Sequence, residues 1–420
     1  LPHFTKSGHN SDPRRVANGP HGRGGPLGGP AIPEPHPLMD AIAAAGEELG
    51  VPRTIDFNSG DQEGVGYYQL FTKNGWRCST AVAYLRPAQK RKNLRTEVNA
   101  QVTRVLFEGA RAVGVEYVQH GKTITLRANR EVLLTAGALQ SPQLLMLSGI
   151  GPEAHLREQG IAIRQALPGV GQNMQDHLQL RLMFKVKKPI TTNDDLQSSW
   201  RKFEMGWKWI TRRAGPLAIG INHGGMFTRV LPESATPDIQ FHFATLSAEM
   251  AGAPTHPWSG CTFSVCQLRP ESRGEIRLKS TDPLLPPAMH SNYLSRETDI
   301  RCAIASVRFA RKLARTQALQ SLIGEEYRPG DSAESDDEVL AFARQYGATI
   351  FHPSGTCKMA PADDPMGVVD TRLRVRGVAG LRVIDCSIMP MLVSGNTNAP
   401  VVMIAEKAAD MIKADNLHAL

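Results

Sequence analysis

Apolar and polar residues alternate with a period of two in several short runs of this chain, a pattern typical of half-buried β-strands. Three such runs follow one another between short turns, as in an antiparallel meander. They are Thr103–Phe107, Ala112–Val118 and Thr123–Leu126. The next run, Glu131–Thr135, is mostly apolar, which indicates a buried strand at the centre of a sheet.

Further along the chain, Leu178–Val186 and Glu275–Lys279 alternate in the same way and predict antiparallel strands. We expect Ile239–Phe243 to belong to the same sheet. By contrast, the first 37 residues are rich in Gly, Pro and His, and that composition is typical of loops.

Helical periodicity and boundary signals predict four helices. They are Leu38–Leu49, Gln143–Leu147, Ser295–Ala318 and Pro400 to about Lys413. Ser141 is the expected N-cap of the second helix, with Pro142 at its first position. Asn398 is a natural cap before Pro400.

At 420 residues, with 41% hydrophobic and 21% charged residues, the chain has the composition of a globular protein of two or three domains. No apolar run approaches the roughly 18 residues of a membrane span, and no secretory signal is visible after Leu1. The net charge of +8 does not indicate nucleic acid, because aromatic residues do not interleave with the one dense basic run, Lys90–Lys92.

Six cysteines are scattered along the chain and form no C-x-x-C pair, so we expect neither a metal site nor a disulfide framework. Free thiols favour a cytoplasmic location, with membrane association as the alternative. A hydrolase is excluded because no G-x-S-x-G elbow occurs.

Two polar segments near the C-terminus are candidates for chemistry. His352–Met359 reads His-Pro-Ser-Gly-Thr-Cys-Lys-Met, and Ser394–Pro400 leads directly into the last predicted helix. Taken alone, a single histidine is more often structural, and the second segment has the features of a helix cap. Together with the strand Gly380–Pro390 between them, they resemble the C-terminal hallmark of the glucose–methanol–choline (GMC) oxidoreductases. In that family a catalytic His is followed, at the interval that separates His352 from Asn396, by a second His or Asn.

Three other stretches support this resemblance. Gly137–Gly151 matches the second signature of the family, Gly169–His177 is similar to its G-V-G-x-N-L-x-D-H segment, and Arg77–Ala81 resembles the stretch after its substrate-side insertion. The resemblance covers essentially residues 1–415, and the choline-dehydrogenase-like branch fits best.

The resemblance implies an α/β fold (α+β overall) with two functional parts. Residues 1–177 and 350–420 would form a Rossmann-like FAD-binding domain that is incomplete at its N-terminus. Residues 178–349 would form a substrate-binding domain with an antiparallel sheet and helices. The implied cofactor is FAD, and the implied partners are a small-molecule alcohol and an electron acceptor, which is a quinone, another carrier or oxygen.

By resemblance, His352 is the base that takes the hydroxyl proton of the alcohol, since neutral imidazole has a pKa near working pH. Asn396 would hydrogen-bond the substrate oxygen and hold its orientation. Asn at this position is what choline-oxidising members carry, which favours choline-like or simple primary alcohols. On the substrate side, Gln240, His242 and Phe243 lie on a predicted strand, and His242 is either a pocket residue or a structural histidine.

For the cofactor, the resemblance places Asp385, Cys386 and Asn398 beside the isoalloxazine and ribityl chain, largely through backbone contacts. Val98 would contact the adenine side. Cys386 has a second interpretation as a small buried packing residue.

An FAD enzyme of this family is expected to begin with a strand, G-x-G-x-x-G and a helix, and the chain shows no such unit. Gly149–Ala154 has a similar spacing but follows a predicted helix, and Gly169–Met174 opens no helix. We therefore expect this polypeptide to be marginally stable and to bind FAD poorly. The alternative function is a truncated, non-catalytic remnant that acts as a binding or regulatory module.

Overall fold

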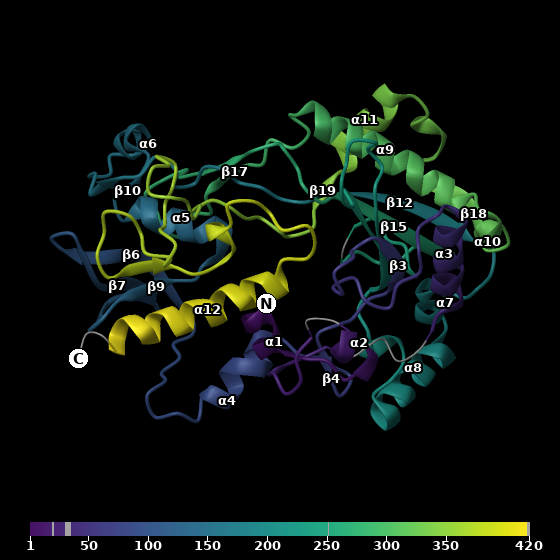
Figure 1. Ribbon diagram of the computed structural model, residues 1–420, viewed down its shortest axis with the longest axis horizontal. Coiled ribbons are helices and arrows are strands. Elements are labelled where there is room, and N and C mark those ends of the chain that lie inside the picture. The colour runs from purple at the N-terminus through teal and green to yellow at the C-terminus, as the bar shows by residue number, and fades with distance from the viewer. Residues whose placement is uncertain (19–20, 30–34, 251, 418–420) are drawn as a thin grey trace. The chain divides into compact units, whose positions relative to one another are not determined.

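The computed structural model describes residues 1–18, 21–29, 35–250 and 252–417, whose main elements are labelled in Figure 1. The chain forms two compact units, each assembled from three separate segments. Unit 1 comprises Leu1–Leu94, Leu178–Leu268 and Glu297–Thr349, and unit 2 comprises Arg95–His177, Arg269–Arg296 and Ile350–Leu420. The mixture of helices and sheets agrees with the expected fold class.

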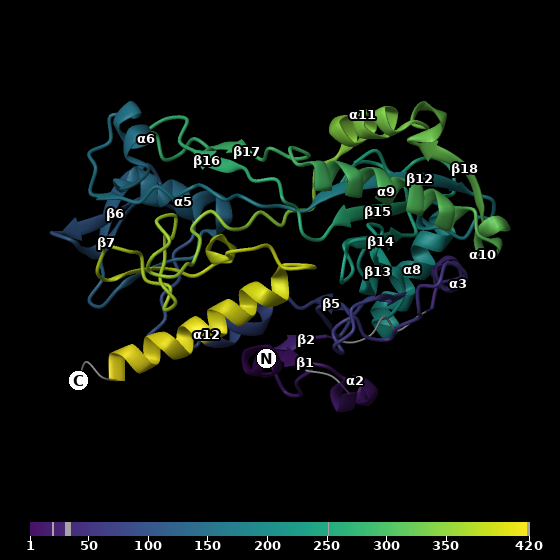
Figure 2. The same cartoon turned by 45° about the horizontal axis from the view of Figure 1, so that its top comes forward.

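Unit 1 is built around an antiparallel sheet with the strand order β18-β12-β15-β14-β13-β3, and β19 pairs with β12. Figure 2 shows β12, β15 and β14 side by side. The strands are β3 (Gly64–Tyr67), β12 (Leu178–Val186), β13 (Asn222–Thr228), β14 (Ile239–Ala244), β15 (Gly260–Gln267), β18 (Ile323–Arg328) and β19 (Ala348–Thr349). The predicted strand Leu178–Val186 is confirmed to the residue, and Ile239–Phe243 does belong to its sheet.

Helices pack against this sheet, and its central strands are buried. Every residue of β14 is buried, and Phe309 of α9 packs against Phe241 with ring centroids 5.9 Å apart. The helices of unit 1 are α3 (Pro37–Glu48), α7 (Thr192–Gln197), α8 (Ser199–Arg212), α9 (Glu297–Ala314), α10 (Gln317–Gln320) and α11 (Asp336–Tyr346). The predicted helix Ser295–Ala318 is too long, because Thr316 takes an extended conformation and separates α9 from α10.

The first 37 residues contain more structure than their composition indicates. Within the part that is described, α1 and α2 each begin at a proline, whose fixed φ suits the first helical position. The short elements of unit 1 are α1 (Pro2–Ser7), β1 (Gly8–His9), α2 (Pro13–Asn18), β2 (Leu27–Gly28), β4 (Thr72–Lys73), β5 (Trp76–Arg77), η1 (Ala81–Leu85), α4 (Arg86–Ala88), η2 (Pro216–Ala218) and η3 (Gly330–Ser332).

Unit 2 combines an antiparallel meander with a parallel pair of strands. The meander β6-β7-β8 confirms the three predicted runs and extends each of them. Beside it, β9 pairs in parallel with β20, in the register Val132 to Leu381. The elements are β6 (Ala100–Glu108), β7 (Arg111–Gln119), β8 (Lys122–Arg127), β9 (Val132–Leu134), α5 (Gly137–Leu147), β10 (Ile150–Gly151), α6 (Glu153–Glu158), β11 (Gln165–Ala166), β16 (Glu275–Arg277), β17 (Ala288–His290), β20 (Leu381–Val383), η4 (Cys386–Ile388) and α12 (Asn398–Leu417).

The predicted strand Glu275–Lys279 belongs to a different sheet from the one expected. It forms β16, which pairs with β17 in a separate hairpin of unit 2. Its central residue, Ile276, is buried in the core of this unit, and the Ile276 N–H donates to the carbonyl oxygen of Gly171 at 2.7 Å. The alternation predicts the strand correctly, but alternation alone does not identify the partner strand.

Helix α5 begins at Gly137 and contains Pro142 in its interior, so the prediction that Ser141 caps a helix starting at Pro142 is wrong. Pro142 has no N–H to donate to the carbonyl of Ala138, four residues earlier. The Thr356 hydroxyl donates to that carbonyl instead, at 2.6 Å. A tertiary hydrogen bond therefore replaces the missing helical one.

The last helix, α12, begins at Asn398, two residues before the predicted start at Pro400. Asn398 is thus the first helical residue rather than the cap before it. Ile404 and Ala408 of α12 join the core of unit 2 with Leu145 and Met146 of α5.

The units divide the chain differently from the three expected segments. The expected boundaries after residues 177 and 349 coincide with passages of the chain from one unit to the other. Residues 1–94, however, cluster with the antiparallel sheet of unit 1, and residues 269–296 cluster with unit 2. The assignment of FAD binding and substrate binding to these parts stays a prediction.

Candidate functional site

The family-like motifs of unit 2 converge at the carboxyl ends of its parallel strands. The N–H groups of Gly355, Cys357 and Met359 donate to carbonyls in the segment 386–388, which follows β20. In the other direction, Ser354 and Gln175 exchange backbone hydrogen bonds of 2.8 and 3.0 Å. The histidine-containing segment therefore lies between the end of β20 and the Gly169–His177 stretch.

His352 is held by two side chains of that stretch. It is 9% exposed, and its backbone N–H donates to Oδ1 of Asp176 at 3.0 Å. The Nδ1 atoms of His352 and His177 are 2.9 Å apart, and the two rings meet edge to face. One of these nitrogens must carry the proton that the other accepts, so the contact couples the tautomers of the two rings.

Asp176 and His177 are site residues for which the sequence patterns predict no role. His177 is fully buried, and the Tyr293 hydroxyl donates to Oδ2 of Asp176 at 2.5 Å. The signal that could have found them is the adjacent Asp-His pair at the end of the Gly169–His177 segment. The contact between His177 and His352 is a tertiary contact, and the spacing of residues in the sequence does not predict it.

Both carboxylate oxygens of Asp385 accept hydrogen bonds from other parts of unit 2. Oδ2 accepts from the N–H of Gly137 at 2.9 Å and from the hydroxyl of Ser141 at 2.6 Å. Oδ1 accepts from the N–H of Ser387 at 2.8 Å. The buried carboxylate thus joins the end of β20 to the N-terminus of α5, where a negative charge is favourable. A contact of Asp385 with a cofactor would have to use its backbone, as the family resemblance implies.

A cavity of about 440 Å³ opens at this end of the parallel strands. Its volume lies within the usual range of cofactor and ligand pockets, and the carboxyl ends of parallel strands are where such folds bind ligands. The lining combines the first turn of α5, the end of β20 and loops next to the two polar motifs: Gln101, Ala136, Gly137, Ala138, Leu139, Gln140, Gln143, Pro283, Leu284, Leu285, Pro286, Pro287, Met289, Phe351, Pro353, Cys386 and Thr397.

Three residues of this lining tie the cavity to the candidate site. Phe351 and Pro353 flank His352, and Thr397 follows Asn396. Phe351 is 79% exposed and has a φ of 65°, a conformation that costs roughly 1–2 kcal/mol for a bulky residue. Backbone strain of this kind is concentrated at functional sites.

Of the predicted cofactor residues, Cys386 alone is among those that line the cavity. Its side chain is partly exposed, and burial, together with the nearby Asp385 carboxylate, raises the pKa of its thiol. A neutral thiol is a poor nucleophile and a poor metal ligand. Cys386 is therefore suited to packing against a ligand and not to reacting with it.

The other predicted residues of unit 2 lie at exposed positions. Asn396 is exposed on the loop before α12, and Asn398 is exposed at the first position of that helix. Val98 is 67% exposed in the loop before β6, and its carbonyl accepts from the side chain of Gln119 at 2.8 Å. Their roles toward substrate and cofactor stay predictions.

On the substrate side, Gln240, His242 and Phe243 are all buried in β14 of unit 1. The Gln240 amide donates to the hydroxyl of Tyr68 at 2.9 Å, and the His242 ring lies 5.6 Å from the Tyr68 ring. These contacts favour the interpretation of His242 as a structural histidine.

A second pair of imidazoles lies in unit 1, with the rings of His36 and His223 5.1 Å apart. Nδ1 of His36 accepts from the N–H of Leu38 and caps α3. Burial, together with the neighbouring His36, lowers the pKa of His223 to about 4. Both rings are therefore expected to be neutral at pH 7.

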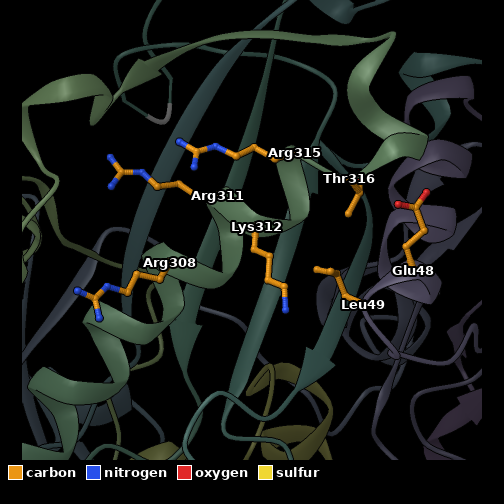
Figure 3. Close-up of a pocket in the computed structure, with 7 residues that line it drawn as sticks. All are labelled: Glu48, Leu49, Arg308, Arg311, Lys312, Arg315 and Thr316. Atoms are coloured by element: carbon orange, nitrogen blue, oxygen red, sulfur yellow. The ribbon is translucent and has the colours of Figure 1, made fainter.

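A cavity of about 500 Å³ lies against α9 in unit 1, and its lining is mostly basic (Figure 3). Several of these charges have structural partners. Arg311 forms an ion pair with Glu326 at 2.9 Å, and Arg308 forms one with Asp336. The carboxylate of Glu48 accepts from the N–H groups of Gln317 and Ala318. These pairs connect elements of unit 1, and none of the family-like motifs contributes to this cavity.

The residues around the cavity of unit 2 fit the ring-bearing half of FAD. Leu139, Leu285 and Pro353 offer apolar surface to a flat ring, and the first turn of α5 offers backbone groups at the strand ends. For the ADP half, the glycine-rich stretches have the wrong context, as predicted. Gly149–Ala154 follows α5 and not a strand, and Gly169–Met174 opens no helix.

Two other kinds of feature are absent from the described ranges. No group of three or more His, Cys, Asp or Glu side chains there could hold a metal ion. Within the same ranges, no helix is both long and apolar enough to cross a membrane.

Comparison with protein families identifies the motifs. Two models, both described as GMC oxidoreductase, match residues 16–179 and 270–405. The first match includes the Gly169–His177 segment, and the second includes His352 and Asn396. The chain belongs to the GMC oxidoreductase family.

Curated relatives of this GMC oxidoreductase include choline dehydrogenases. The mitochondrial choline dehydrogenase of Mus musculus is 43% identical over 413 residues, which is 98% of this chain and 69% of the relative. The oxygen-dependent choline dehydrogenase of Staphylococcus aureus (strain JH9) is 40% identical over 93% of this chain and 69% of its own length.

Solved structures of GMC oxidoreductases have a similar fold. Pyridoxine 4-oxidase from Mesorbium loti is 28% identical with a TM-score of 0.83, over 98% of this chain and 76% of that protein. A formate oxidase of Aspergillus oryzae is 26% identical with a TM-score of 0.92, over 100% of this chain and 78% of that protein. The GMC oxidoreductases are FAD-binding flavoproteins, and the chain is accordingly an oxidoreductase of a family that acts on alcohols.

Proposed function

We propose that this GMC oxidoreductase oxidises a primary alcohol of the choline type to the aldehyde, with His352 as the base. The observation that carries the proposal is the buried His352, held by Asp176 and His177 beside the cavity at the ends of β9 and β20. The similarity to choline dehydrogenases from Mus musculus and Staphylococcus aureus supports choline or a close analogue as the substrate.

Oxidation of an alcohol needs a base that takes the hydroxyl proton while a hydride leaves the neighbouring carbon. For His352 to act through Nε2, that nitrogen must carry a lone pair, so its Nδ1 must carry the proton in the neutral ring. His352 would then donate from Nδ1 to Nδ1 of His177, 2.9 Å away. In this proposal His177 selects the tautomer of His352 that can accept a proton.

In this proposal the remaining residues bind the cofactor and orient the substrate. FAD, when bound, supplies the hydride acceptor. Residues 136–138 and Cys386 would hold the ring-bearing half of the cofactor through backbone groups. Asn396, on the loop that leads into α12, would donate from its amide to the substrate oxygen and fix its direction. Asn398 and Asp385 would contribute backbone contacts, and Val98 would contact the adenine side.

The proposal is tested by flavin reduction in the purified chain supplied with FAD in excess, because we expect this polypeptide to bind FAD poorly. Choline added without oxygen is expected to bleach the absorbance of the protein-bound flavin. Replacing His352 by Gln is expected to slow this reduction on the order of a thousandfold, with the flavin still bound. His290→Gln is the matched control, because His290 is exposed on β17, and it should reduce flavin like the unmodified chain.

Three results would contradict the proposal. If choline and simple primary alcohols leave the bound flavin oxidised, the substrate class is wrong. If His352→Gln reduces flavin at the rate of the His290 control, His352 is not the base. Failure of the chain to bind FAD would count against any oxidation by this polypeptide.

A further inference from the structure

Helix α8 presents a row of four large apolar side chains to solvent. Trp200, Phe203, Trp207 and Ile210 are 71%, 59%, 59% and 64% exposed. Their spacing of three and four residues places them on one face of the helix. Exposed apolar rows of this size mark interaction sites, whereas single exposed apolar residues do not. We call these four residues the aromatic row.

The opposite face of α8 fixes the helix to unit 1. Met205 is 8% exposed, and the Trp209 indole N–H donates to the carbonyl of Gly75 at 2.9 Å. The Trp209 ring meets Trp76 edge to face at 4.5 Å, and the guanidinium of Arg213 lies 4.3 Å from the centre of the Trp209 ring. The helix already has an anchored face, so the aromatic row is not the face that packs on the core.

The rings of the aromatic row also order one another. Trp200 stacks on Phe203 with centroids 5.7 Å apart, and Phe203 stacks on Trp207 at 6.4 Å. The following turn, η2, adds Leu217, which is 53% exposed. These exposed apolar side chains lie on α8 and on the turn that follows it, and α8 lies at the periphery of unit 1 in Figure 1.

The charges beside the aromatic row are almost all positive. Between Ser199 and Arg213 the only acidic residue is Glu204. The basic residues are Arg201, Lys202, Lys208, Arg212 and Arg213. Two of them pair within the unit, Arg201 with Asp195 at 3.3 Å and Lys208 with Glu204 at 3.9 Å. The excess of positive charge is complementary to a surface of anionic groups.

We propose that α8 docks this protein on the surface of a lipid bilayer that contains anionic lipids. Trp and Phe on one face, with Lys and Arg around them, are the composition of helices that lie in the plane of a membrane interface. At 14 residues, α8 is too short to span the hydrocarbon core, so it lies on the bilayer. Trp, Phe and Arg are also enriched at protein interfaces, but lysine is depleted there. Lys202 and Lys208 border the row, and they favour the bilayer over a protein partner.

The test is co-sedimentation of the full chain with vesicles. We expect binding to vesicles of phosphatidylcholine mixed with phosphatidylglycerol and much weaker binding to phosphatidylcholine alone. The triple variant Trp200→Ser, Phe203→Ser, Trp207→Ser should lose at least about tenfold in partition coefficient. Lys202→Gln with Arg212→Gln should lose on the order of tenfold on anionic vesicles.

Leu126→Ser is the matched control, since Leu126 is a 57% exposed apolar residue on β8, outside α8. It should bind vesicles as the unmodified chain does. All the substitutions are at exposed positions, and equal melting temperatures would show that the variants are folded.

Three outcomes would overturn the proposal. The first is a triple variant that binds anionic vesicles as tightly as the Leu126 control. The second is an unmodified chain that does not bind anionic vesicles. The third is a chain that self-associates through the aromatic row, as seen when sedimentation velocity gives a dimer that the triple variant abolishes. That result would assign the face to a second copy of the chain.

Discussion

At the scale of single residues, the site depends on a contact between two imidazoles. The Nδ1 atoms of His352 and His177 are 2.9 Å apart, so one of them carries a proton and donates it to the other in a hydrogen bond. The backbone N–H of His352 donates to Asp176, which holds the main chain at this residue. The ring itself is buried and packs edge to face against His177. In the proposed function, His177 is a positioning residue that acts through the proposed base, His352.

This arrangement predicts the effect of replacing His177. In the protein supplied with FAD, His177→Leu should lower kcat for choline on the order of a hundredfold with a smaller change in KM, because His352 loses the acceptor that selects its tautomer. The pH dependence of kcat should change as well. His177→Asn keeps an acceptor in the same region and should recover most of the activity.

Steady-state kinetics and a pH profile of each variant check this prediction. A His177→Leu protein that melts like the unmodified chain and retains its kcat would show that His177 only fills space. Equal losses in the Leu and Asn variants would lead to the same conclusion.

At the scale of elements, α5 depends on a side chain far away in the sequence. Its carbonyl at Ala138 faces Pro142, which has no N–H, and the hydroxyl of Thr356 takes the place of the missing donor. The same segment, 355–359, carries backbone hydrogen bonds to residues 386–388. The geometry of the site thus relies on contacts between α5, η4 and the histidine-containing segment.

Thr356→Val tests this contact. The substitution preserves shape and removes the hydroxyl, which leaves the buried Ala138 carbonyl without this donor. The free energy of unfolding should fall by about 1–3 kcal/mol, as measured by denaturant titration. Thr356→Ser keeps the hydroxyl and should lose less, and equal losses in both variants would indicate that the methyl group matters instead.

The elements also show what the sequence can and cannot predict. The limits of β12 follow from a clean alternation, and the meander follows from its turns. The predicted start of α5 is wrong because Ser141-Pro142 has the composition of a helix start, whereas Asp385 caps the helix earlier, at Gly137. Alternation predicts the strand β16 correctly, but tertiary packing determines that it pairs with β17. His352 and Asn396 come from a family resemblance, while the pairing of His352 with His177 depends on chain segments that only the fold brings together.

At the scale of the whole molecule, stability should depend on the charge state of buried histidines. The folded pKa of His223, about 4, is below its ordinary value of 6.5, so the unfolded chain takes up a proton first as the pH falls. The contribution of His223 to the free energy of unfolding therefore decreases between pH 6.5 and 4, by up to about 1.4 kcal/mol per pH unit. Above pH 6.5 this contribution is constant.

Melting temperatures at pH 7 and pH 5 check this sign. The unmodified chain should melt at a lower temperature at pH 5, and His223→Gln should show a smaller difference between the two pH values. His290→Gln, at an exposed position, should behave like the unmodified chain. A His223→Gln protein with an unchanged pH dependence would assign the effect to other groups.

The parallel pair β9–β20 has a consequence for synthesis on the ribosome. The residues that meet at the ends of these strands, such as Ser141 and Asp385, are 244 positions apart. At the usual rate of translation, roughly 10 to 50 s pass between their emergence. During that interval the nascent chain carries an apolar strand without its parallel neighbour, and a holding chaperone has a defined window in which to bind it.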